Sequence, residues 1–205
     1  MKTIDRRKSW DMTASRNNAG TAALTLYLCA TAVAFLHGSQ ASAAWIDITP
    51  AAGQVILQIN YAGTPTVMFT VPAALLGNGT AIAGTPALEF ELSIRRTGVI
   101  IGTPLTATMT ATAPAALFSG ANQIPITAIS WTSAAIAGAP GGTTLIPNGS
   151  FVAGPQTIVG ITTPFIFGTT VYAGGALTFY FDNNTIYPQG TYGPATVNYT
   201  ASRNP

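Results

Sequence analysis

Alternating apolar and polar positions run through much of this 205-residue chain, and such a period of two predicts β-strands. The stretch GQVILQINY, residues 53–61, shows the pattern well, with Ile56 as its one exception. One face of the predicted strand carries Val55, Leu57, Ile59 and Tyr61. Because that face is apolar, it requires burial, either in the molecule's own sheet or in the sheet of a neighbour.

The alternation is clearest in LEFELSIRR, residues 88–96. Four apolar side chains point one way, and the other face carries Glu89, Glu91, Ser93 and Arg95. We therefore predict one dry and one solvated face for this strand. In ALTFYFD, residues 176–182, both faces are substantially apolar, which indicates a central strand or one that a partner covers.

Turn residues recur every eight to twelve positions and helical periodicity is absent, as is typical of a β-sandwich or barrel. The predicted strands are 54–61, 65–71, 87–95, 104–111, 125–132, 144–146, 150–153, 157–161, 176–182 and 191–200. Asn148-Gly149 suits a type I′ turn, because both residues tolerate positive φ. We predict a tight hairpin there.

The N-terminal residues have the composition of a secretion signal. A basic stretch is followed by an uncharged apolar run from Ala22 to Leu36 and by the small residues Ala41-Ser42-Ala43. We predict that residues 1–43, including Cys29, are cleaved off. A retained membrane helix is the alternative, but it needs about 20 apolar residues, and this run is shorter.

Charge is scarce in the remaining chain, residues 44–205. The whole sequence has a formal net charge of +2, but much of its basic character lies in the leader. Residues 44–205 carry only Asp47, Glu89, Glu91, Asp182, Arg95, Arg96 and Arg203, a net charge of about −1. Seven charged residues in 162 is about 4%, far below the roughly 25% of residues that are charged in an ordinary soluble domain. No basic patch is left for nucleic acid, and little repulsion is left to keep copies apart.

Residues 44–205 contain no His, Cys or Lys, which excludes the common catalytic triads, the usual zinc sites and Schiff bases. Glu89 and Glu91 would project about 6–7 Å apart from one strand face, a spacing found in inverting glycosidases. A solvated face with Arg95 as ion-pair partner is the simpler interpretation. We expect no enzymatic activity and no cofactor or metal.

Three other groups of residues could in principle bind or carry a carbohydrate or a calcium ion. An aromatic surface for carbohydrate would draw on Trp131, Tyr172, Tyr180, Tyr187 and Tyr192, although core packing accounts for each of them equally well. Asn-x-Ser/Thr motifs occur at Asn78, Asn148, Asn183 and Asn198, and most of them lie in predicted turns, where Asn is common for its backbone. The Asp182-Asn183-Asn184 triplet lacks the further carboxylates that calcium needs.

The C-terminal segment YPQGTYGPATVNYTAS, residues 187–202, has a Tyr-Pro-x-Gly-x-Tyr corner and a final alternating strand. Together with the Gly-Gln-Val-x-Leu-x-Ile start of residues 53–59, it resembles secreted, immunoglobulin-like pilus subunits, and most closely the archaic chaperone–usher pilins and spore-coat-U-like proteins. The resemblance covers short segments near the two ends. Several of those pilins carry a disulfide, which residues 44–205 cannot form.

The resemblance implies an all-β, immunoglobulin-like antiparallel β-sandwich that lacks one strand, which an N-terminal strand of the next subunit replaces. On this view residues 44–61 are the donor segment, with Val55, Leu57, Ile59 and Tyr61 as the inserting side chains, and residues 62–205 are one sandwich domain. Implied partners are other copies of the chain, a periplasmic chaperone and an outer-membrane assembly protein, with a final place in a cell-surface fibre. The alternative is a self-contained secreted binding module or adhesin.

Overall fold

The computed structural model is all-β and describes residues 20–29, 44–46, 49–60, 65–96, 104–165 and 168–204. The strands are β1 Gly20–Cys29, β2 Val55–Asn60, β3 Thr66–Thr70, β4 Ile82–Ala83, β5 Leu88–Arg95, β6 Thr106–Ala113, β7 Ala116–Ser119, β8 Asn122–Pro125, β9 Ile129–Ala134, β10 Thr144–Leu145, β11 Gly149–Ser150, β12 Gly154–Thr162, β13 Thr170–Phe181 and β14 Thr191–Asn204. Two short 3-10 turns, η1 Ala73–Leu75 and η2 Ile126–Ala128, complete the regular structure of the described residues. The prediction of an all-β fold is confirmed.

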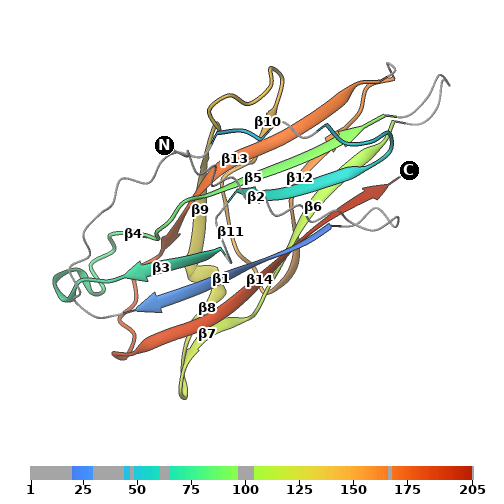
Figure 1. The fold of residues 1–205 in the computed structure, drawn as a ribbon. Coiled ribbons are helices and arrows are strands. Elements are labelled where there is room, and N and C mark those ends of the chain that lie inside the picture. Colours follow the sequence, from blue (N-terminus) through green and yellow to red (C-terminus); the bar gives the residue numbers. More distant parts are fainter. Residues whose placement is uncertain are drawn as a thin grey trace, which may run out of the picture.

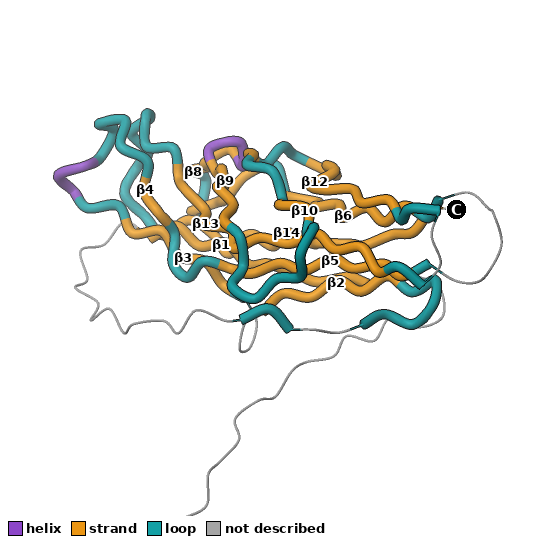
Figure 2. Tube along the Cα trace, turned by 90° about the horizontal axis from the view of Figure 1, so that it is seen from above, coloured by secondary structure: helices purple, strands orange, loops and turns teal. Residues whose placement is uncertain are grey.

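The strands form two main sheets that lie over one another as layers (Figures 1 and 2). One sheet has the order β12-β6-β14-β1-β3, and the other has the order β11-β9-β13-β5-β2, with β4 and β10 added beside β13. Strands β7 and β8 form a separate hairpin. Most neighbours are antiparallel, but β1 runs parallel to β3 and β10 runs parallel to β13.

A single apolar core fills the space between the layers. The ring of Phe90 on β5 lies 4.7 Å from the ring of Tyr199 on β14, which joins the two sheets near the middle of both strands. A second aromatic group, made of Trp131, Phe151 and Phe179, has ring separations of 5.0 and 6.0 Å. The members of this second group lie on β9, directly after β11 and on β13, which are strands of one sheet, so the group adds apolar area to the core, whereas the Phe90–Tyr199 contact links the two layers directly.

The predicted hairpin at Asn148-Gly149 is wrong. Strand β11 pairs with β9, whereas β10 pairs with β13, so the two strands flanking these residues do not pair with each other. The indole N–H of Trp131 donates to the carbonyl of Pro147 at 2.9 Å, and the side-chain oxygen of Asn148 accepts from Ser133 N at 2.8 Å. The backbone of Gly149 packs closely against the indole of Trp131, because a Cβ added to Gly149 would lie 2.5 Å from a ring carbon. These tertiary contacts outweigh the local turn preference.

The Tyr-Pro-x-Gly-x-Tyr segment forms a compact corner at the start of β14. Tyr192 is buried, and its hydroxyl donates to the backbone carbonyl of Pro188 at 2.7 Å. The ring of Tyr187 packs edge-on against Tyr192, with the ring centres 6.4 Å apart. This bond from the strand back to the preceding loop fixes where the C-terminal strand enters its sheet.

Candidate functional site

The predicted donor strand pairs within its own chain in this structure. Strand β2 runs antiparallel to β5, with Leu57 opposite Leu92 and Ile59 opposite Phe90. The side chains of Val55 and Leu57 are buried, and Ile59 is half-buried against the core. Tyr61 lies outside the described residues. Because β2 is the last of the described strands in its sheet, it has one ladder in this part of the chain, the ladder with β5.

Residues 44–46 lie over the outer face of the same sheet. The backbone N–H of Trp45 donates to Ala137 O at 3.1 Å, and its indole packs edge-on against Tyr172 with ring centres 5.7 Å apart. The indole reaches so close to the sheet that a Cβ on Gly174 would lie 2.6 Å from it. One residue further, Ile46 N–H donates to a carboxylate oxygen of Glu91 at 3.1 Å.

This cover changes the interpretation of the Glu89 and Glu91 face, which was predicted to be solvated. Glu89, Glu91 and Ser93 are only 8%, 3% and 6% exposed. Glu91 accepts hydrogen bonds from Ile46 N–H and from the side-chain amide of Asn60, the residue that ends β2. The alternation correctly separated two faces of the strand, but it could not show that the N-terminal segment covers the polar one. Glu91 therefore serves to hold two parts of the N-terminal region against β5.

Burial raises the pKa of Glu89 above its ordinary value of 4.5, and a hydrogen bond from Asn60 opposes the shift. The native protein therefore binds this proton more tightly than the unfolded chain does. The ionised Glu89 carboxylate therefore lowers the free energy of unfolding at pH values above the raised pKa, and this effect vanishes below pH 4.5. We predict that Glu89→Gln increases the free energy of unfolding at neutral pH, by an amount that shrinks to nothing as the pH falls. Urea unfolding of both proteins across the pH range measures this difference, and a difference that does not change with pH would contradict it.

The most unusual feature of the fold is the strand between β3 and β14. That place, which we call the β3–β14 position, holds β1, and all but the first two residues of β1 belong to the apolar run of the predicted leader (Figure 1). Strand β1 is antiparallel to β14, with Leu24 opposite Val197, and parallel to β3, with Leu26 beside Val67. It thus makes ladders on both sides, in the interior of a sheet. Nothing in the alternation of residues 44–205 predicts this strand.

The two neighbours present a continuous apolar wall toward the core at this position. Its residues, all between 0 and 5% exposed, are Val67 and Phe69 on β3 and Tyr192, Ala195, Val197, Tyr199 and Ala201 on β14. Among the described strands, β3 has its only ladder with β1, apart from an isolated bridge between Met68 and Thr85. Strand β14 pairs with β6 over residues 198–204, whereas over residues 191–197 its ladder partner is β1. The end of one sheet therefore depends on the strand at the β3–β14 position.

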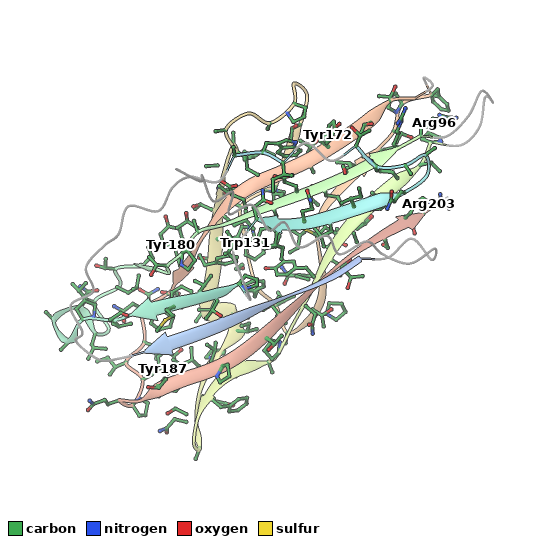
Figure 3. The ribbon with its side chains drawn as sticks, in the orientation of Figure 1. Arg96, Trp131, Tyr172, Tyr180, Tyr187 and Arg203 are labelled. Atoms are coloured by element: carbon green, nitrogen blue, oxygen red, sulfur yellow. The ribbon has the colours of Figure 1, made fainter. Side chains whose placement is uncertain are left out.

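The five aromatic residues weighed as a sugar-binding surface do not gather on one face. Trp131 and Tyr192 are buried in the core, Tyr172 packs against Trp45, and Tyr187 lies at one end of the molecule (Figure 3). Tyr180 is half-buried on β13. Since two of the five cannot reach solvent, these residues do not form one exposed platform.

Asn183 and Asp182 have structural roles in the loop after β13. The side chain of Asn183 is 1% exposed, accepts from Gly77 N–H at 3.1 Å and donates to the carbonyl of Leu75. Asp182 accepts from Asn184 N–H at 3.2 Å. Among the described residues no three His, Cys, Asp or Glu side chains cluster in a way that could hold a metal ion. In that same part of the chain, no helix is long and apolar enough to cross a membrane.

The sequence matches no protein-family model, and no curated protein matches it.

Proposed function

We propose that this protein is a structural subunit of an extracellular fibre, and that its copies join by β-strand donation. The observation that supports the proposal most is the occupation of the β3–β14 position by residues of the predicted leader. If residues 1–43 are removed during export, β3 loses its ladder partner and half of β14 loses one as well. Open edges and an uncovered apolar wall are a strong template for another strand.

Residues 53–61 of a second copy fit the vacated position. If Gly53 takes the place of Gly20, opposite Ala201, then Leu57 falls opposite Val197 and Tyr61 falls in the place of Leu28. Directly opposed residues of an antiparallel pair lie on the same face of the sheet, so the four apolar side chains of the donor would point at the core. The predicted donor residues Val55, Leu57, Ile59 and Tyr61 are thus given a matching acceptor, whose lining the sequence alone could not assign.

Transfer of residues 53–61 from β5 to the β3–β14 position of another copy is favoured because the strand gains a second hydrogen-bonded neighbour. Among the described strands of its own chain, β2 lies at an edge and pairs only with β5, whereas a strand at the β3–β14 position pairs with both neighbours. Leaving β5 gives up one ladder together with the Asn60–Glu91 hydrogen bond, and the new position supplies two ladders and a more enclosed apolar face. The scarcity of charge in residues 44–205 also leaves little repulsion between copies.

The remaining parts of the proposal follow from the resemblance to secreted pilins. The two layers would be an immunoglobulin-like sandwich that is short of one strand until assembly. A subunit with an open β3–β14 position would aggregate in transit, so a periplasmic chaperone that lends a strand and an outer-membrane assembly protein are the expected partners. The mature protein would then reside in a fibre at the cell surface.

The test compares residues 44–205 with residues 62–205 by size-exclusion chromatography and by unheated and boiled SDS gels. We expect the longer chain to form ladders that only boiling dissolves and the shorter chain to form none. A third chain supplies the control: residues 62–204 followed by a short Gly-Ser loop and GQVILQINY should be a stable monomer, because the appended strand reaches the β3–β14 position antiparallel to β14. If the 44–205 chain is a monomer and only loses thermal stability on truncation, β2 belongs to its own sheet, and a self-contained binding module becomes the better account.

A further inference from the structure

We propose that residues 20–29 act as an internal substitute for the donor strand, so that a chain retaining its leader is closed to strand donation. This inference rests on the proposed function and concerns the regulation of the same site. Strand β1 occupies the β3–β14 position, where residues 20–29 pair with β14 and residues 25–29 pair with β3 as well. A second copy cannot enter a position that is already paired on both sides.

The leader segment and the donor segment share a sequence pattern. GTAALTLYL, residues 20–28, and GQVILQINY, residues 53–61, both begin with glycine and carry apolar residues at every second position after it. Polar residues match at two of the intervening positions, Thr21 with Gln54 and Thr25 with Gln58. Two segments with one pattern compete for one place, and the observed register of β1 is the register that the donor would need.

Covalent attachment decides the competition in favour of the leader. A tethered strand has an effective concentration of about 1 mM, well above the concentration of free copies in solution. Hydrolysis of the peptide bond between Ala43 and Ala44 adds one water molecule, leaving a carboxylate on Ala43 and an amine on Ala44, and the tether is lost. The bound leader segment then dissociates, and the position opens only after the chain has been processed.

The chain's single cysteine provides a direct probe. Cys29 is the register partner of Thr191, an exposed residue at the start of β14. Opposed residues of an antiparallel pair have Cα atoms about 4.5–5.5 Å apart, which lies within the range of a disulfide. We expect Thr191→Cys in the full chain to form an internal disulfide with Cys29 on mild oxidation. Thr132→Cys, at another exposed position but on the other sheet, serves as the matched control and should form no such disulfide.

The same protein can be used to measure whether the β3–β14 position is closed to a second strand. A protease site replaces residues 41–43, and uptake of fluorescent GQVILQINY peptide is followed before and after cleavage. We expect uptake to be at least about 100-fold slower before cleavage. In the oxidised Thr191→Cys protein, cleavage alone should leave uptake slow, and reduction of the disulfide should release it.

Two results would overturn the inference: no disulfide between Cys29 and the residue introduced at position 191, or equally fast peptide uptake by the uncleaved chain. Failure of the proposed function looks different. The disulfide would form, yet the cleaved and reduced chain would take up no peptide and would form no polymer.

Discussion

In the chain that carries GQVILQINY after residue 204, changing Leu57 to Asp should lower the free energy of unfolding by at least about 4 kcal/mol. The proposed register puts Leu57 opposite Val197, a residue with no exposed surface. An ionised carboxylate there would lose its hydration and find no positive partner in the apolar wall of β3 and β14. The appended strand would detach, and the β3–β14 position would open.

Gln58→Asp in the same appended strand is the matched control. Residue 58 lies on the opposite face of the strand, so the same carboxylate should stay in water and change the free energy of unfolding by less than about 0.5 kcal/mol. Urea unfolding followed by tryptophan fluorescence measures both variants. Equal losses for the two substitutions would show that the strand does not insert with Leu57 facing the core.

Replacing Asn183 by Ala should lower the free energy of unfolding of the full chain by about 2 kcal/mol. Its buried amide joins the loop after β13 to the loop after η1, accepting from Gly77 N–H and donating to Leu75 O. Its own backbone carbonyl also accepts from Gly79 N–H at 3.2 Å. Alanine leaves the half-buried N–H of Gly77 without this partner, whereas Leu75 O keeps the hydrogen bond that it accepts from Asn78 N–H at 3.2 Å. One unpaired group costs about 1–3 kcal/mol.

The neighbouring residue Asn184 provides the comparison for this prediction, because its side chain is exposed. Asn184→Ala should change the free energy of unfolding by less than about 0.5 kcal/mol. Chemical denaturation of both variants gives the difference. If both asparagines prove equally dispensable, the loop does not depend on the buried amide.

Much of the strand pattern could be predicted from the sequence, because alternation is a local property. The alternating segments LEFELSIRR and GQVILQINY appear as β5 and β2 within one or two residues of their predicted bounds. Alternation does not say what lies on a face, however, and the burial of Glu91 comes from Ile46 and Asn60, which are distant in sequence. The turn preference of Asn148-Gly149 failed for the same reason, since Trp131 and Ser133 hold that segment.

The sequence predicted the proposed donor strand of the candidate site but not the acceptor. The donor side chains could be named because they belong to one short segment, whereas the β3–β14 position brings together residues 66–70 and 191–201, which no local pattern links. Strand β1 was missed because an uncharged apolar run after basic residues is also the pattern of a secretion signal. Residues 20–29 have both the composition of a leader and the alternation of a strand. The sequence alone therefore could not predict that they pair with β3 and β14.

The central claim is that the β3–β14 position stays open until a strand from outside residues 62–205 fills it. Amide hydrogen exchange on residues 66–70 and 191–197 tests this most directly, in the 62–205 chain and in the chain carrying the appended GQVILQINY strand. Met68 N–H is set aside because it donates to Thr85 O in either chain. We expect the other amides to exchange rapidly in the first chain and to be protected at least about 100-fold in the second, with residues 198–204 protected in both by their ladder with β6. Equal, strong protection of residues 66–70 and 191–197 in the 62–205 chain would contradict the account, because it would mean that the sheet is complete without a donated strand.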